Sequence, residues 1–334
     1  MAASLPEHVR KWLIDPSQGW SDRNDAWPPL AFVELDRLDT ATLPPGPLPP
    51  FPVVGIGDPA HPLATTLDVV VEPPISAESL LRQVQQAPHT AATLVQLLRA
   101  TEGLPLDRAL TLESMCYGLL QGSAEHAAWL AGRSPASRPP APGQVLVERR
   151  GGTLHVILDR PHARNAIDRT MRDQLADAFT LAALDRDIET VKLSAVGSAF
   201  SMGGDLDEFG TTRDPVTAHL IRSRVLPALA LARRPEIVHA YVQGGCVGAG
   251  LEIAAFAARV TASANAWFQL PEVAMGVIPG AGGCVSIPRR VGRQRAALLM
   301  LSGRRINAAT ALRWGLIDAI EEAPPADEGG THVP

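Results

Sequence analysis

Three glycine-rich runs in the second half of the sequence place small residues beside polar or acidic ones. The runs are AFSMGGDL at 199–206, GGCVGAGLEIAAF at 244–256 and FQLPEVAMGVIPGAGG at 268–283. Each lies where an apolar stretch gives way to a turn or helix, and glycine there lets the backbone approach a ligand closely. Glu252 and Glu272 are lone carboxylates among otherwise apolar neighbours.

These residue types together point to one kind of chemistry. Backbone N–H groups at turns and helix starts suit the binding of an anion or of a developing oxyanion. Carboxylates in apolar surroundings suit proton transfer, because lost hydration moves a carboxyl pKa toward the working pH. The spacing therefore predicts a site that stabilises negative charge on a carbonyl oxygen while two carboxylates move protons.

Composition limits the classes of protein that fit. The chain has 334 residues, a net charge of −5 and no basic run, which disfavours nucleic acid or an anionic membrane as a partner. The three cysteines are far apart and make neither a disulfide framework nor a metal-ligand cluster. No apolar run is long enough to span a membrane, and no secretory signal opens the chain. We expect a soluble, cytoplasmic protein.

Strands and helices alternate along residues 144–320, which predicts an α/β fold. Residues 144–161 have the alternation of a β-hairpin with a Gly-Gly turn, and Asp168 is placed to cap the helix that follows. Further strands are expected at 191–197, 237–244 and 259–270.

Residues 1–133 are an N-terminal extension of a different character. Short strands are expected at 30–36, 51–58 and 67–73, and the GIGD turn at 55–58 lacks the rest of a nucleotide-binding motif. From Ser76 the apolar period becomes helical, which predicts an amphipathic helical module over about 76–131. A proline-rich linker at 134–143 and a disordered tail at 321–334 complete the expected organisation.

The three glycine runs, in this order and at these separations, resemble the crotonase (enoyl-CoA hydratase/isomerase) superfamily. RPHARNAIDRTMRDQL at 160–175 is similar to that family's opening signature, and SGRRINAATALRWGLID at 302–318 to its later one. The resemblance covers about 144–320. It implies a spiral of ββα units that assembles as a homotrimer or as a dimer of trimers.

The resemblance also implies roles for particular residues. An acyl-CoA thioester would bind with its carbonyl oxygen between the backbone N–H groups of Met202 and Ala249, and Glu252 and Glu272 match the two glutamates of family hydratases. The residues implied for binding of coenzyme A are Ala163, Arg164, Asn165, Gly203, Gly204 and Asp205. Arg164 also fits a solvated surface position. The cysteines and histidines have no nucleophile or metal spacing, so neither a metal nor a cofactor is expected, coenzyme A being part of the substrate.

One feature departs from the family pattern. Family chains follow the GLID strand with roughly sixty residues of helices, whereas only a short segment follows GLIDAIEE at 315–322. The segment 67–135 is similar to that missing module, which suggests that the helices have moved to the front, as in a circular permutation. The alternative is an unrelated helical domain in front of a shortened core.

Hydration of an enoyl-CoA is the predicted reaction because both glutamates are present. Two alternatives stay open: a different reaction on the same fold, such as double-bond isomerisation or hydrolysis of a CoA ester, and an acyl-CoA-binding protein without activity.

Overall fold

The computed structural model describes residues 5–18, 20, 28–38, 46–134 and 140–322, which form two compact units. As far as described, the first unit comprises 1–137, 209–224 and 269–304, and the second comprises 138–208, 225–268 and 305–334. The predicted core at 144–320 is thus divided, because two of its segments belong to the unit of the N-terminal helices. Part of the predicted linker and most of the predicted tail, residues 135–139 and 323–334, lie outside the described residues.

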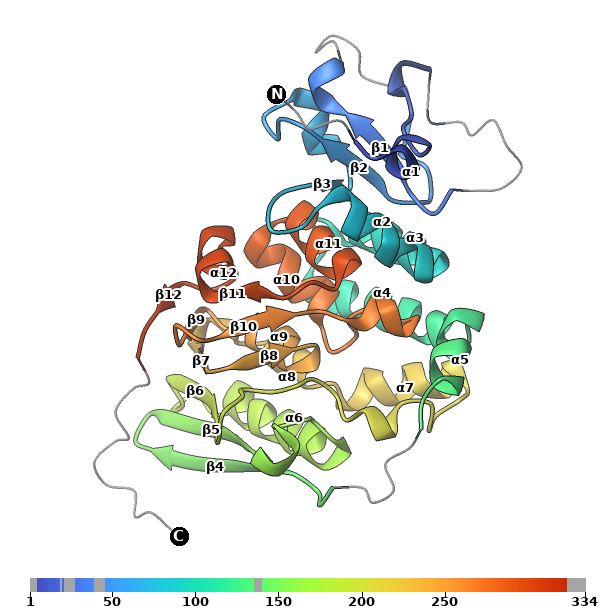
Figure 1. Ribbon diagram of the computed structural model, residues 1–334. Helices are drawn as coiled ribbons and strands as arrows, with labels where there is room; N and C mark the ends of the chain where they lie inside the picture. The colour runs from blue at the N-terminus through green and yellow to red at the C-terminus, as the bar shows by residue number, and fades with distance from the viewer. Residues whose placement is uncertain (1–4, 19, 21–27, 39–45, 135–139, 323–334) are drawn as a thin grey trace. The chain divides into compact units, whose positions relative to one another are not determined.

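The second unit is built on a six-stranded sheet in the order β12-β9-β7-β6-β5-β4 (Figure 1). Its strands are β4 (Gln144–Arg150), β5 (Thr153–Asp159), β6 (Thr190–Ala195), β7 (Val238–Val242), β9 (Arg259–Ala262) and β12 (Ala319–Ile320). β4 and β5 form the predicted antiparallel hairpin, with Gly151 at φ +59° in its turn. All other neighbours in this sheet are parallel. Parallel strands joined by helices confirm the α/β class.

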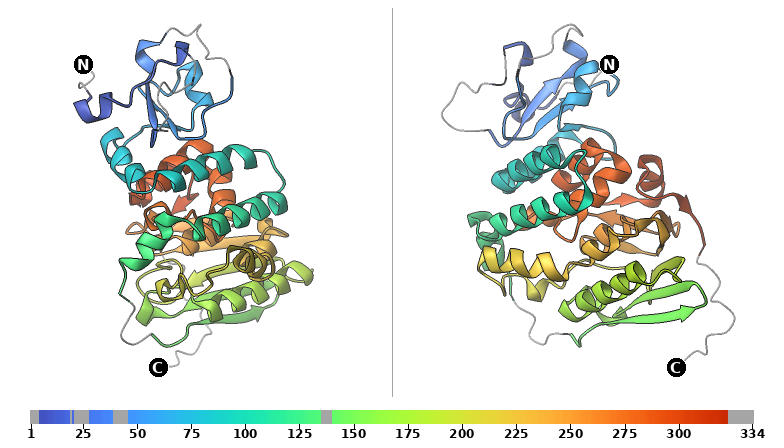
Figure 2. Two further views of the ribbon diagram at one scale, coloured as in Figure 1. Left: turned by 90° about the vertical axis from the view of Figure 1, so that its right-hand side faces the viewer. Right: turned by 180° about the vertical axis from the view of Figure 1, so that it is seen from behind.

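Helices and a smaller sheet complete the second unit. The helices are α6 (Arg169–Leu184), α8 (Pro227–Leu231), α9 (Ala249–Ala254) and α12 (Ala308–Trp314). Asp168 caps α6 as predicted by accepting the N–H of Met171 at 2.8 Å, and α6 packs on β4, β5 and α8 (Figure 2). The smaller sheet has the order β11-β10-β8, with β8 at Gly245–Val247, β10 at Trp267–Gln269 and β11 at Ile306–Asn307. The expected strand at 259–270 is therefore two strands, β9 and β10, in different sheets.

The first unit begins with a parallel sheet of β1 (Ala31–Glu34), β2 (Val53–Ile56) and β3 (Val69–Val70), at the three predicted strand positions. Leu13 forms a parallel bridge with Phe32 beside β1. A buried apolar cluster supports the sheet, formed by Ala31, Val33, Leu35, Phe51, Val53, Leu63, Ala64 and Leu67.

The helical module follows this sheet as α2 (Ala77–Gln86), α3 (Pro88–Thr101), α4 (Leu106–Gln121) and α5 (Ala124–Ala131). Ser76 caps α2, as predicted, by accepting the N–H of Ser79 at 3.2 Å. Within the same unit, α2 and α3 pack on α11 (Arg293–Ser302), and α3 and α4 pack on α10 (Gly283–Val291) (Figures 1 and 2). The predicted apolar faces therefore bury themselves against the segment that follows Glu272. The unit also contains α1 (Glu7–Arg10) and α7 (Pro215–Val225).

An aspartate leads in the same way into β3 of the first unit and β12 of the second, each an edge strand that pairs in parallel with its neighbour. Asp68, before β3, accepts the N–H of Val53 on the neighbouring strand at 2.9 Å and donates its own N–H to the carbonyl of that residue at 3.1 Å. Asp318, before β12, makes the same two bonds to Val260, at 2.6 and 2.8 Å. In the first unit Arg99 adds an ion pair to Asp68, with Nε donating to Oδ1 at 2.7 Å. Both strands thus enter their sheets through an equivalent contact.

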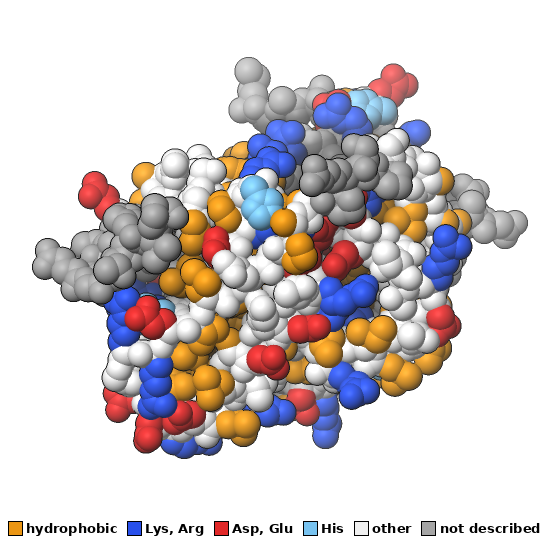
Figure 3. Space-filling view, turned by 90° about the horizontal axis from the view of Figure 1, so that it is seen from below, with side chains coloured by type: hydrophobic (Ala, Val, Ile, Leu, Met, Phe, Trp, Pro, Cys, Tyr) orange, Lys and Arg blue, Asp and Glu red, His pale blue; other side chains and the backbone are white. Residues whose placement is uncertain are grey.

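Charges at the surface are mixed in sign. Acidic and basic side chains are interspersed on the face drawn in Figure 3, and Arg149 pairs with Asp185 at 2.7 Å on the second unit. None of the helices in the described parts of the chain combines the length and apolar character of a membrane span.

Candidate active site

Glu252 is held in the first turn of α9, in the second unit. Its side chain is buried, with 2% of the residue exposed, and its N–H donates to the carbonyl of Gly248 at 2.9 Å. Gly248 precedes the helix at φ +47°, a conformation that favours glycine and lets the chain turn sharply from β8 into α9. The sequence around Glu252 therefore places a carboxylate at a tight strand-to-helix turn, as predicted.

The first two glycine runs lie side by side in this unit. Ser201 and Cys246 form a parallel bridge, in which the N–H of Ser201 donates to Gly245 at 3.1 Å and that of Val247 to Ser201 at 2.9 Å. A Cβ on Gly250 would lie 2.5 Å from the Cβ of Ser201, so only glycine allows this approach. The structure thus brings the backbones that carry Met202 and Ala249 together.

The two predicted oxyanion donors differ in their hydrogen bonding. Ala249 is the first residue of α9, where no carbonyl within the helix accepts the N–H. The N–H of Met202 donates to the carbonyl of Arg164 at 3.1 Å. Arg164 has φ +51°, which turns this carbonyl toward the 202 loop. The site as described therefore has one amide at a helix start and one amide already bonded to the 160–165 turn.

The residues predicted to bind coenzyme A come together around this turn, but several have internal partners. The Asn165 side chain is fully buried; its Oδ1 accepts the N–H of Arg160 at 2.7 Å, and its Nδ2 donates to the carbonyls of Val196 and Ala199. The Asn165 side chain thus braces the turn, and the binding of coenzyme A at this residue stays a prediction.

Asp205, Gly203 and Gly204 also have internal partners. The carboxylate of Asp205 pairs with the buried guanidinium of Arg160 at 2.7 Å, while Gly203 accepts from Ile167 at 2.8 Å. Gly204 forms a parallel bridge with Ile167. Of the six predicted residues Arg164 is exposed, Ala163, Gly204 and Asp205 are half-buried, and Asn165 and Gly203 are buried.

Glu272 belongs to the first unit, so the two predicted acid–base residues lie in different compact units. It begins the 3₁₀ turn η7 (Glu272–Met275), and 7% of the residue is exposed. Its carbonyl accepts the N–H of Val277 at 3.2 Å, and Gly276 ends the turn at φ +70°. Each unit therefore buries one of the two glutamates at a turn shaped by glycine.

Burial and hydrogen bonding at the three cysteines disfavour a reactive thiolate. Burial raises the pKa of the Cys246 thiol far above its usual value, and the Cys284 thiol donates to the carbonyl of Pro279 at 3.3 Å. Burial, with the nearby Glu113 carboxylate, also raises the pKa of Cys116. No group of three or more potential metal ligands is gathered within the described ranges.

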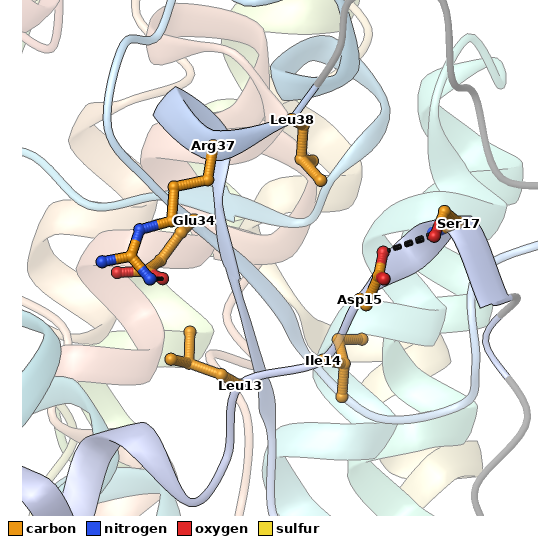
Figure 4. A pocket seen from close by; sticks show the side chains of 7 residues that line it. All are labelled: Leu13, Ile14, Asp15, Ser17, Glu34, Arg37 and Leu38. Carbon is orange, nitrogen blue, oxygen red and sulfur yellow. Dashed lines mark hydrogen bonds and ion pairs between the residues drawn. The ribbon is translucent and has the colours of Figure 1, made fainter.

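A pocket that the sequence did not indicate lies beside β1 in the first unit (Figure 4). Its volume is about 400 Å³, and it is lined by Leu13, Ile14, Asp15, Ser17, Glu34, Arg37 and Leu38. Asp15 accepts hydrogen bonds from Ser17, and Glu34 pairs with Arg37 at 2.9 Å. All the lining residues precede residue 39, so none of them is among the residues predicted to bind or act on acyl-CoA.

Comparison with known proteins decides the family. The enoyl-CoA hydratase/isomerase family model matches residues 148–326, more than half of the chain. The chain belongs to the enoyl-CoA hydratase/isomerase family. Membership confirms the crotonase-type fold and an enzyme of the hydratase/isomerase class.

Individual members of the enoyl-CoA hydratase/isomerase family agree with this assignment. The chain is 34% identical to 2,3-dehydroadipyl-CoA hydratase of Escherichia coli K12 over 53% of this chain and 69% of that protein. It is 34% identical to a probable enoyl-CoA hydratase of Mycobacterium bovis over 55% of this chain and 70% of that protein. A solved structure from Mycobacterium abscessus, named as a candidate enoyl-CoA hydratase/isomerase, shares 35% identity and a TM-score of 0.51, covering 55% of this chain and 73% of that one.

Sequence reasoning missed two buried residues of the helical module that contact the segment after Glu272. Glu113 accepts the N–H groups of Gly282 and Cys284 at 2.8 and 2.9 Å, and His126 contacts the carbonyl of Met275 at 2.8 Å. A lone glutamate and a lone histidine on helices gave no signal, since their partners are 149 or more residues away in the sequence.

Proposed function

We propose that this enzyme is an enoyl-CoA hydratase that adds water across the α,β double bond of an acyl-CoA thioester. The observation that carries the proposal is the pairing of the two glycine runs through Ser201 and Cys246, with Glu252 buried in the adjoining turn. Family membership and the names of the relatives support the reaction class.

The proposed mechanism uses Glu252 and Glu272 as an acid–base pair. One glutamate takes a proton from water, whose oxygen attacks the β-carbon, and the other delivers a proton to the α-carbon. The negative charge that develops on the thioester oxygen is bound by backbone N–H groups, a contribution of about 3–4 kcal/mol for each donor. The chemistry requires no metal or cofactor, because coenzyme A arrives with the substrate.

The backbone N–H groups of Ala249 and Met202 are the proposed donors. The Ala249 amide stands at a helix start, whereas the Met202 amide must exchange the Arg164 carbonyl for the thioester oxygen, or share its proton between them. The Met202 side chain packs beside Gly245 and Trp267, where its sulfur narrows the space next to the loop. We propose that Ala163 and Arg164 provide the accessible contacts to coenzyme A.

Turnover of crotonyl-CoA tests this function. We expect the enone absorbance to fall when the enzyme is added, because hydration removes the conjugated double bond. Unchanged absorbance with a folded protein that still binds coenzyme A would contradict the hydratase proposal. That result would favour the inactive acyl-CoA-binding alternative, to which the internally bonded Met202 amide also points.

The assembly that we propose is a homotrimer or a dimer of trimers in the cytoplasm. It is supported by exposed apolar side chains on α4 and α7 of the first unit, two helices that Ser114 and His219 join at 2.9 Å. The exposed residues are Met115 and Leu119 on α4 and Val216 and Leu220 on α7. Light scattering coupled to gel filtration is expected to give three or six times the 35.4 kDa of one chain. A mass of one chain at micromolar concentration would contradict the assembly.

We also propose that α2–α5 are the family's C-terminal helical module, moved to the front of the chain. Support comes from the strand that precedes them: β3 enters its sheet through Asp68 as β12 enters its own through Asp318. The module also packs on α10 and α11 within its unit. In the family pattern the helical module follows the GLID strand, which corresponds to β12, and here α2–α5 follow the similar strand β3.

A further inference from the structure

The 3₁₀ turn that begins with Glu272 is held at its other end by a histidine of the helical module. His126 Nδ1 lies 2.8 Å from the carbonyl oxygen of Met275. A carbonyl can only accept, so Nδ1 carries the proton and donates it. The ring is buried, with 2% of the residue exposed, and stacks on Trp129 at a centroid distance of 5.6 Å.

The backbones of the two segments are also in contact. A Cβ on Gly276 would lie 2.4 Å from the backbone nitrogen of His126, so α5 packs directly on the residue that ends η7. Gly276 at φ +70° thus serves both the turn and the close approach. The position of η7 therefore depends on that of α5.

α5 itself is firmly attached to α3. The Glu125 carboxylate accepts the N–H and hydroxyl of Thr90 at 2.9 and 2.6 Å and the N–H of His89 at 2.9 Å. Burial opposes ionisation of Glu125, but these hydrogen bonds outweigh it and lower the pKa of the carboxyl. The charged Glu125 carboxylate therefore stabilises this contact fully at a pH above the pKa that the carboxyl has in the unfolded chain. This stabilisation is lost as the pH falls through the lower pKa of the folded state.

We propose that His126 is a positioning residue for Glu272. By holding the Met275 carbonyl it fixes the end of a single turn whose first residue is Glu272, and the bonds within the turn, from Gly276 to Val273 and from Val277 to Glu272, transmit that position. The inference rests on the proposed function, because it assigns the relocated module a role in the hydration step. A displacement of about 1 Å at a reacting group can cost up to about 10²-fold in rate.

Two variants of similar shape test the proposal. In His126→Asn an amide N–H group replaces Nδ1 on the Cγ atom, so a donor remains. In His126→Leu the Cγ atom branches in the same way but carries two methyl groups and no donor. We expect His126→Leu to lower kcat for crotonyl-CoA by about 10–10²-fold with KM changed less than about 2-fold, and His126→Asn to keep kcat within about 3-fold. Equal kcat in the Leu variant and the wild type, or equal losses in both variants, would overturn the proposal.

Hydrogen exchange of the peptide that spans 272–277 separates this proposal from the proposed function, because it needs no turnover. The amides of Gly276 and Val277 are expected to exchange faster in His126→Leu than in the wild type and His126→Asn. Unchanged exchange in the Leu variant would show that His126 does not hold η7, whatever the activity. An inactive wild-type protein would contradict the proposed function, and the exchange comparison alone would then decide whether His126 holds the turn.

Discussion

The Glu252→Gln variant is expected to lose about 10²–10⁴-fold in kcat for crotonyl-CoA with little change in KM. The amide keeps the size of the buried side chain but neither accepts nor delivers a proton, and general acid–base catalysis contributes an effect of this order. Steady-state kinetics on the purified variant provide the measurement. Glu272→Gln is expected to behave in the same way, because the proposed mechanism uses both carboxylates in one proton-transfer cycle.

The matched control is Glu236→Gln in the same unit, where the side chain is 66% exposed. It is expected to keep the kcat of the wild type. If folded Glu252→Gln and Glu272→Gln variants both retain full hydratase activity, the acid–base roles assigned to them are wrong.

Replacement of Glu113 is expected to destabilise the fold strongly. The residue is completely buried on α4, and its two oxygens accept the N–H groups of Gly282 and Cys284 at the start of α10. Glu113→Ala leaves these amides without their carboxylate and opens a cavity, so we expect the free energy of unfolding to fall by about 3–5 kcal/mol. Glu113→Gln keeps the volume and one acceptor, and is expected to cost about 2 kcal/mol. Thermal and denaturant unfolding measure both.

Glu102→Gln provides the control for these stability measurements. Its side chain is 64% exposed in the same unit, so the change is expected to lie within about 0.5 kcal/mol of the wild type. A Glu113→Ala variant that unfolds at the same midpoint as this control would show that the buried carboxylate does not hold α10.

Local signals made much of the fold predictable. The side chains of Ser76 and Asp168 cap α2 and α6 by accepting backbone N–H groups a few residues away. The hairpin turns at Gly151 because glycine readily adopts the positive φ found there. The apolar faces of the module also followed from helical spacing, since Leu80, Leu94 and their neighbours are buried as the pattern indicated.

Contacts between distant segments were not predictable in the same way. The apolar run at 259–270 reads as one strand, but the chain turns between Ser263 and Ala266 and continues in another sheet. The sequence around Asn165 does not show that its amide braces three backbone groups, which lie up to 34 residues apart from it. The same applies to Glu113, whose partners are 169 and 171 residues away.

The candidate site was predictable to the extent that it depends on glycine. The runs around Met202 and Ala249 meet because Gly250 allows an approach that a Cβ would block, and this requirement is visible in the sequence. The bond from Met202 to Arg164 was not visible, because it depends on the positive φ of Arg164. Glycine spacing therefore indicated the location of the site but not the hydrogen-bond partners of its amides.

Mass analysis of the product formed from crotonyl-CoA in ¹⁸O-labelled water tests the central claim most directly. We predict a thioester that has gained one water molecule, with ¹⁸O in its β-hydroxyl group and the bond to coenzyme A intact. Free coenzyme A with ¹⁸O in a released carboxylate, or recovery of crotonyl-CoA without gain in mass, would contradict hydration as the reaction of this enzyme.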